Sequence, residues 1–130
     1  MATIFSKIVA GEIPAYKIAE NDEFLAFLDV FPLRKGHTLI IPKTEVNYIF
    51  GLEDEQLGRM MIFAKKVALA LEKAMPCKRI GVTVIGLEVP HAHIHLIPIF
   101  SEKDLEFSGG KMKLEPEEFL EIQKKIVSNL

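Results

Sequence analysis

The sequence predicts an α+β domain whose strands pair antiparallel, and three observations support this class. Its predicted elements follow the order helix, three strands, long helix, two strands, helix. Hairpin-length connections join successive strands, whereas parallel strands need long crossovers. The chain has 130 residues, of which 49% are hydrophobic, which suits one domain with its own core. We therefore expect residues 1–130 to form a single domain.

The first third of the chain predicts a short N-terminal helix and three strands. Thr3 can cap a helix over residues 3–10, which Gly11 ends. Strands are expected over residues 16–20 and 24–29, as a hairpin around the Asn21-Asp22 turn. A loop over residues 32–36 leads to a third strand, over residues 37–41, which Pro42 closes.

The remainder predicts one long central helix, two strands and a C-terminal helix. Apolar residues at steps of three and four favour a helix over residues 53–75 with an acidic first turn. Its apolar face would comprise Leu57, Met60, Met61, Ala64, Val67, Ala68, Leu71, Ala74 and Met75. Strands are expected over residues 79–85 and 92–100, and a mobile loop over residues 101–114. Pro116 begins a helix whose apolar face would hold Phe119, Ile122, Ile126 and Val127.

Composition excludes several classes of protein. The net charge of −2 gives no reason to expect binding to nucleic acid or to an anionic membrane. Cys77 is the single cysteine, so neither an internal disulfide nor a Cys-based zinc finger can form, and a cytoplasmic location is expected. No targeting segment is visible, and no apolar run approaches the roughly 18 residues of a membrane span. The mean hydropathy of +0.22 is high for a small domain and favours a homo-oligomer.

Three of the four histidines fall within five residues, at His91, His93 and His95. On a strand, alternate residues share one face, so the three imidazoles should project together while Ala92 and Ile94 enter the core. A lone histidine is usually a satisfied polar group, but three in register need something to organise them. Either a metal site or metal-free nucleophilic catalysis at phosphorus fits this pattern.

These residues resemble the histidine-triad (HIT) family, whose motif His-φ-His-φ-His-φ-φ fits residues 91–97, φ being apolar. Further blocks resemble the protein kinase C-interacting-protein-like (Hint) branch in the same order: IFSKI at 4–8, EIPA at 12–15, AFLD at 26–29, GHTLIIPK at 36–43 and EVPH at 88–91. The resemblance covers a core over about residues 2–100 and leaves a C-terminal tail and helix over residues 101–130. It implies the HIT fold, a five-stranded antiparallel sheet with helices, and a homodimer whose protomers join their sheets.

The resemblance also implies roles for single residues. His93 resembles the nucleophile, His95 the residue that contacts the phosphate, and His91 the residue whose carbonyl orients the nucleophile. His37 matches a fourth histidine that lies behind the other three. The implied nucleotide-binding residues are Asp29, at the ribose hydroxyls, and Phe27, Val30, Ile4, Phe5, Ile8 and Glu88. The alternatives are ordinary core packing for the apolar residues and a turn cap for Asp29.

The sequence departs from the family in two places. Leu87 stands just before the triad where relatives often have a hydrogen-bonding Gln, and the preceding loop is short. The chain has no Trp, and its tail is closer to bacterial-type members of the family. The tail from Glu102 to Leu114 either edges the site or is a solvated linker. Arg34, Lys35 and Lys43 either steer a polyphosphate or form a solvated charged surface.

The resemblance implies a nucleotide hydrolase or transferase that acts at an α-phosphate through a covalent nucleotidyl-histidine intermediate. The expected substrate is a purine nucleotide, as a nucleoside phosphoramidate or a dinucleoside polyphosphate, and no cofactor is required. Two alternatives stay open. One is a zinc-dependent hydrolase or metal-binding protein using the three triad histidines, and the other is a nucleotide-binding scaffold with little turnover.

Overall fold

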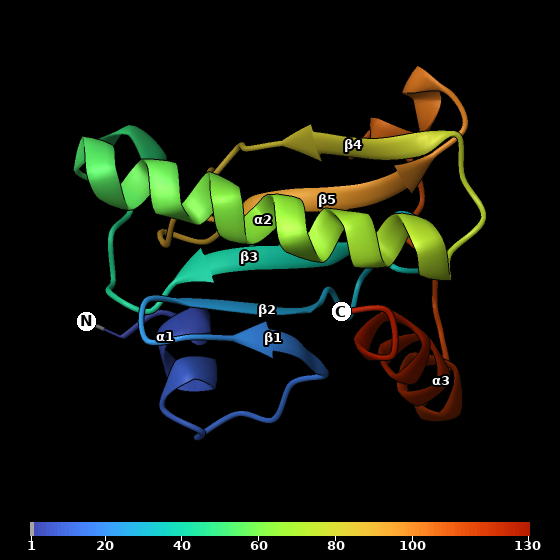
Figure 1. Cartoon of the computed structure of the whole chain (residues 1–130), viewed down its shortest axis with the longest axis horizontal. Coiled ribbons are helices and arrows are strands. Elements are labelled where there is room, and N and C mark those ends of the chain that lie inside the picture. The colour runs from blue at the N-terminus through green and yellow to red at the C-terminus, as the bar shows by residue number, and fades with distance from the viewer. Residues whose placement is uncertain (1) are drawn as a thin grey trace.

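The computed structural model describes residues 2–130, and in this range it confirms the predicted α+β class (Figure 1). Five antiparallel strands form one sheet in the order β1-β2-β3-β5-β4. The strands are β1 (Lys17–Glu20), β2 (Phe24–Leu28), β3 (Thr38–Pro42), β4 (Arg79–Thr83) and β5 (Ile94–Ile99). The helices are α1 (Ile4–Val9), α2 (Asp54–Ala74) and α3 (Pro116–Val127), with 3-10 turns η1 (Ile49–Gly51) and η2 (Glu102–Leu105).

The centre of the sheet pairs two strands that lie far apart in the sequence. In the β3–β5 register, Leu39 lies opposite His95 and Ile40 lies opposite Ile94. This pairing brings the end of the loop that carries His37 next to the histidine-rich segment. Neither local propensity nor hairpin spacing specifies such a long-range contact.

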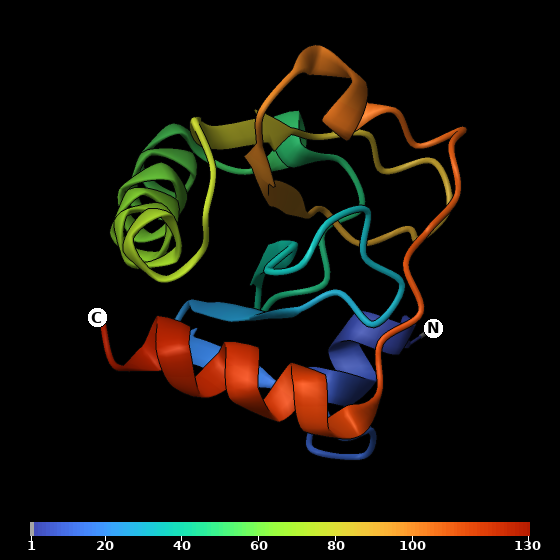
Figure 2. The same cartoon turned by 90° about the vertical axis from the view of Figure 1, so that its right-hand side faces the viewer.

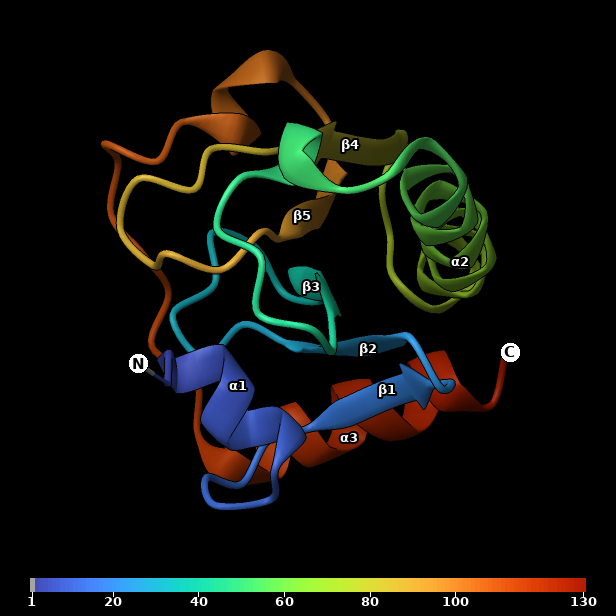
Figure 3. The ribbon, with the colours of Figure 1, turned by 90° about the vertical axis from the view of Figure 1, so that its left-hand side faces the viewer.

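The two faces of the sheet carry different layers (Figures 2 and 3). Helices α2 and α3 cover one face and enclose the larger core, which includes Ile40, Ile94 and Leu96. Helix α1 packs on the other face, where Phe5 and Ile8 meet a smaller cluster that includes Leu39. Because side chains alternate along β5, His95 lies on the α1 side while its neighbours lie on the α2 side.

Three predicted details are wrong. The buried face of α2 includes Phe63 and Ala70 but not Met61, because Phe63 packs on Phe24 of β2, with ring centroids 5.7 Å apart, while Met61 points to solvent. Val127 is 43% exposed because it lies about 100° around the helix from Ile126, outside the stripe of Phe119, Ile122 and Ile126 that is buried. The tail is not a plain loop, since η2 forms within it and begins at a capping box built by Ser101 and Asp104.

The predicted start of α1 is confirmed in detail, because the Thr3 side chain accepts a hydrogen bond from the Ser6 amide. None of the helices within residues 2–130 is long and apolar enough to cross a bilayer.

Candidate active site

All four histidines gather in one buried cluster on the α1 side of the sheet. His91 and His93 lie in the segment that enters β5, and His95 lies in the strand itself. Each of the three, and also His37, has 7% or less of its surface exposed. The ring centroids of His93 and His95 are 4.8 Å apart, and those of His37 and His95 are 5.1 Å apart. The intervening Ala92, as predicted, packs into the larger core.

The His93 ring is oriented by the main chain of its own segment. Its Nδ1 lies 2.7 Å from the carbonyl oxygen of His91. A carbonyl can only accept, so Nδ1 carries the proton and Nε2 keeps its lone pair. Burial lowers the pKa of His93, which keeps this lone pair free near neutral pH. Phe5 packs edgewise on the ring, with centroids 5.0 Å apart.

A chain of hydrogen bonds fixes the protons of the His37 and His95 rings. The Leu33 amide donates to His37 Nδ1 over 3.0 Å, so the His37 proton is on Nε2. His37 Nε2 lies 2.9 Å from His95 Nδ1 and donates to it, which places the His95 proton on its own Nε2. Burial lowers the pKa of both rings to about 3, so both are neutral. Lys111 and His93 lower the pKa of His37 further, and His37 and His93 lower that of His95.

The two outward nitrogens of the cluster therefore differ in character. His93 Nε2 presents a lone pair, and His95 Nε2 presents an N–H. Within residues 2–130 no fully buried polar side-chain atom lacks a hydrogen-bond partner, so these two unpaired nitrogens reach the protein surface. A nucleophile beside a hydrogen-bond donor is the arrangement that displacement at a phosphoryl group requires.

The prediction that the three triad imidazoles project together is wrong for His91, because its ring is fully buried and its two nitrogens bind groups inside the protein. The His91 ring instead joins α1 to the site. Its Nε2 donates to the Pro42 carbonyl over 2.8 Å, and its Nδ1 accepts from the Thr3 hydroxyl over 2.9 Å. Glu45 Oε1 accepts from the Thr3 amide over 2.9 Å and from the Ser6 hydroxyl over 2.7 Å. The Ser6 and Thr3 hydrogen bonds lower the pKa of Glu45. Sequence reasoning missed Ser6 and Glu45 and gave Thr3 only its capping role.

Asp29 lies beside the cluster, with one oxygen engaged in a turn. Its Oδ1 accepts from the Phe31 amide over 2.8 Å, which is the cap considered above. Its Oδ2 lies 3.6 Å from His37 Nε2. The donor atoms of Asp29, His37 and His95 lie within 4.8 Å of one another, close enough to hold a metal ion. This set differs from the three triad histidines, because both nitrogens of His91 already have partners. Both nitrogens of His37 also have partners, so a metal ion would have to replace the His37–His95 hydrogen bond.

The remaining nucleotide-binding candidates divide by burial. Phe5, Ile8 and Phe27 are buried in the smaller core. Core packing therefore accounts for their apolar character, and they form part of the core beneath the histidine cluster. Ile4 is 51% exposed and Val30 is 49% exposed, which leaves both free to contact a ligand. Glu88 is also exposed, and its charge, like that of Asp29, favours the protonated form of His93.

The C-terminal tail borders the cluster. Phe107 packs edgewise on His95, with centroids 4.8 Å apart, and on His37 at 6.1 Å. The structure therefore favours a tail that borders the site over a tail that is only a solvated linker. Sequence reasoning missed Phe107, because no periodicity marks an aromatic residue in an irregular segment.

The three loop cations form ion pairs on the surface. Arg34 lies 3.3 Å from Asp104 and Lys35 lies 3.3 Å from Glu118, so both tie the loop before β3 to the tail or to α3. Lys43 lies 2.8 Å from Glu20. These contacts favour the interpretation of a charged surface over that of a polyphosphate path.

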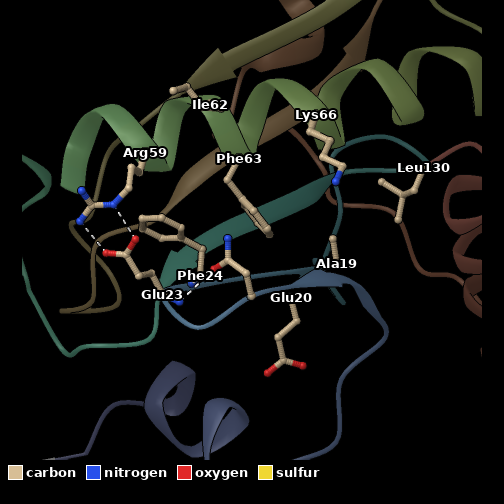
Figure 4. Close-up of a pocket in the computed structure, with 10 residues that line it drawn as sticks. Ala19, Glu20, Glu23, Phe24, Arg59, Ile62, Phe63, Lys66 and Leu130 are labelled. Carbon is tan, nitrogen blue, oxygen red and sulfur yellow. Dashed lines mark hydrogen bonds and ion pairs between the residues drawn. The ribbon is translucent and has the colours of Figure 1, made fainter. Parts of the chain in front are cut away.

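A separate hollow lies on the α2 side of the sheet, between α2 and the β1–β2 turn (Figure 4). Phe24 and Phe63 line its floor, and Arg59 donates to both oxygens of Glu23 at its rim, over 2.6 and 2.8 Å. The histidine cluster lies on the opposite face and contributes no residue to this hollow.

Three comparisons place this arrangement among known proteins. A model of the HIT domain matches residues 10–102. A HIT-like protein of Borreliella burgdorferi is 37% identical over 135 residues, covering 98% of this chain and 97% of that protein. Adenosine 5′-monophosphoramidase hnt1 of Schizosaccharomyces pombe is 35% identical over 133 residues, covering 100% and 99%. The crystal structure of a HIT-like protein involved in cell-cycle regulation from Bartonella henselae matches with a TM-score of 0.84 at 30% identity, covering 98% and 96%.

Proposed function

The chain belongs to the HIT domain family, and on that premise we propose that it is a nucleotidyl hydrolase or transferase that uses His93 as nucleophile. One observation carries the proposal. The lone pair of His93 Nε2 and the N–H of His95 Nε2 reach the same surface, each fixed by hydrogen bonds behind it. No metal or redox cofactor is needed for this chemistry.

The reaction would proceed in two displacements. His93 Nε2 attacks the α-phosphorus, a P–N bond forms, and the bond to the leaving group breaks with its electron pair on that group. The His95 N–H donates to the leaving atom as negative charge develops there. An anionic leaving group departs without a proton, whereas an amine takes one along this hydrogen bond. Water then attacks phosphorus, and the P–N bond breaks with its electron pair on His93 Nε2. After an amine has left, the proton of the water goes to His95 Nε2 and replaces the one transferred; after an anionic group has left, it goes to solvent.

The nucleoside would lie toward α1 and the loop after β2. Asp29 keeps Oδ2 free of the Phe31 amide, so this oxygen suits a ribose hydroxyl. Ile4 and Val30 are the exposed apolar side chains suited to a purine base. The name of the fission yeast relative, adenosine 5′-monophosphoramidase, supports an adenosine phosphoramidate as a substrate to test first. A dinucleoside polyphosphate is the second substrate class that we propose.

The two alternatives rest on specific residues. Asp29, His37 and His95 could bind zinc, and chelation sensitivity would reveal it. Leu87 is 88% exposed and offers no hydrogen bond to a phosphate, which would suit a scaffold that binds nucleotide and turns it over slowly.

The test measures turnover of a fluorogenic adenosine phosphoramidate with and without EDTA, for the wild type and for His93→Ala. Turnover that survives EDTA and is lost in His93→Ala, while this variant still binds AMP, supports the proposal. Mass spectrometry of the acid-quenched reaction should find a nucleotidyl group on the peptide that contains His93. Loss of activity in EDTA with recovery in zinc would favour the metal enzyme. AMP binding without turnover by the wild type would favour the scaffold.

We further propose a homodimer that pairs β4 with its copy. β4 is an edge strand of the sheet, so its outer hydrogen-bonding groups are unpaired there. Exposed apolar side chains accompany this edge and the outer face of α2, among them Val82 at 51% and Ile62 at 71%. Light scattering should give twice the chain mass for the wild type and a lower mass for Val82→Asp. A monomeric wild type would refute the dimer.

A further inference from the structure

The segment between η2 and α3 crosses the histidine side of the sheet. Figures 2 and 3 show it running from η2, beside β4, past the loops that precede β3 and β5, to α3 beside β1. We call residues 106–112 the C-terminal strap. It belongs to neither packed core and lies on the face opposite α2.

Specific contacts hold the strap in place at both ends. Next to its start, Asp104 accepts from the Phe100 amide over 2.7 Å and pairs with Arg34 at 3.3 Å. At its end, the Met112 amide donates to the Pro32 carbonyl over 2.7 Å. Arg34 and Pro32 belong to the same loop that presents His37. The strap is therefore attached to the scaffold of the site and not only to α3.

The strap lies on the His95 side of the cluster. The His95 ring is flanked by His93 and Phe107, with centroid distances of 4.8 Å to each. Phe5 of α1 packs on His93 and so marks the opposite side. In a phosphoryl displacement the attacking and leaving atoms lie roughly in line across phosphorus. A leaving group that moves away from His93 and accepts the His95 N–H would therefore meet the strap.

Lys111 adds a positive charge to this side. The amide of the adjoining Met112 is bonded to Pro32, in the loop that presents His37, and this holds Lys111 on the same side of the cluster. Besides burial, the charge of Lys111 lowers the pKa of both His37 and His95. The side chain is exposed, and no ion pair within residues 2–130 includes it, in contrast with Arg34 and Lys35. The Lys111 ammonium could therefore pair with a bound anion.

Resting on the proposed function, we propose that Lys111 is a specificity-determining residue that binds an anionic leaving group, with Phe107 as the wall of that subsite. The substrate class is then a nucleotide whose α-phosphate carries a further phosphate, such as a dinucleoside polyphosphate. Recognition of the leaving group would come from the strap, because Leu87, in the loop before the triad, is apolar and offers no hydrogen bond.

The kinetic test compares two substrates that differ in the charge of the leaving group. These are diadenosine triphosphate, which releases a nucleotide anion, and an adenosine phosphoramidate of an uncharged amine. We expect Lys111→Ala to lower kcat/KM about fivefold to tenfold for the first and less than about twofold for the second. Lys111→Arg should restore the preference. Lys113 is an exposed lysine two residues further along the tail. Lys113→Ala is therefore the matched control and should change kcat/KM for neither substrate.

Two further measurements make the outcome decisive. Added salt should slow diadenosine triphosphate turnover more in the wild type than in Lys111→Ala. In the His93→Ala background, Lys111→Ala should weaken diadenosine triphosphate binding but not AMP binding, whether or not the wild type turns over either substrate. An unchanged ratio of these two affinities would overturn the proposal for Lys111. Failure of the wild type to turn over either substrate, with that ratio altered, would instead overturn only the proposed catalysis.

Discussion

Replacing His37 with leucine is expected to slow the proposed catalysis strongly without changing any atom that faces the substrate. His37 Nε2 is the donor to His95 Nδ1 and thereby keeps the His95 proton on Nε2. Leucine offers no donor, so the His95 proton can move to Nδ1. His95 would then present a lone pair to the leaving group, which repels developing negative charge instead of stabilising it.

The magnitude follows from the two hydrogen bonds that are lost. The Leu33 amide and His95 Nδ1 would both be left buried without a partner, at about 1–3 kcal/mol each. The free energy of unfolding should therefore fall by about 2–6 kcal/mol, partly recovered by the apolar side chain. The turnover rate should fall about 10² to 10⁴-fold, which is the typical effect of losing one positioned proton donor. His37→Gln retains an amide donor and should be affected less on both measures.

The assay is a long-range ¹H–¹⁵N correlation spectrum of the histidine rings, combined with single-turnover kinetics and urea unfolding. In the wild type near neutral pH we expect the Nε2–H tautomer for His37 and His95 and the Nδ1–H tautomer for His93. The wild-type spectrum does not depend on whether the leucine variant folds. An Nδ1–H tautomer of His95 in the wild type, or an unchanged rate in a folded His37→Leu, would refute this reasoning.

Three further outcomes are expected. Because burial lowers the pKa of His93, kcat/KM should be level near neutral pH, and its acid limb should lie below the ordinary histidine value of about 6.5; a limb above that value would contradict the buried, neutral nucleophile. The pKa of His37 and His95 is lowered to about 3 in the folded protein, so the unfolded chain binds more protons between that value and about 6.5. Urea titrations should show the unfolding free energy constant above about pH 6.5 and falling below it, by up to about 1.4 kcal/mol per pH unit for each ring; stability that rises on acidification would contradict this. Thr3→Val should lose the helix cap and leave His91 Nδ1 unpaired, lowering the unfolding free energy by about 1–3 kcal/mol in thermal melts, while Thr3→Ser should match the wild type.

The periodic features of the fold could be predicted from the sequence. The spacing of apolar residues predicts α2 over residues 53–75, and the helix spans Asp54–Ala74. Alternation around the triad predicts that Ala92 and Ile94 enter the core, and they do. Both depend on a repeat along a single element. The repeat carries no information about the neighbours of that element. For this reason the spacing predicts Met61 on the buried side of α2, whereas Phe63 packs inward.

The assembly of the site depends on contacts that no local pattern encodes. The Thr3–His91 hydrogen bond spans 88 residues, and the Thr3–Glu45 hydrogen bond spans 42. His37 enters the cluster only because β3 pairs with β5. The resemblance to the family supplied its place, whereas Glu45 and Phe107 had no signal at all. A threonine that caps a helix and a threonine that orients a histidine look the same in the sequence.

Main-chain groups set the protonation of three of the four rings, and that of His95 follows from His37. The His91 carbonyl orients His93, the Leu33 amide orients His37, and the Pro42 carbonyl orients His91. A main-chain carbonyl cannot donate and an amide cannot accept, so these ring tautomers follow from the fold and do not change with nearby side chains. In the proposed reaction, recognition of the leaving group is different, because it would depend on exposed side chains in loops. Leu87 offers no hydrogen bond before the triad, while Phe107 packs on His95 from the tail and Lys111 would supply a charge there. On this proposal, the attacking end of the reaction stays constant while the class of leaving group changes with the tail.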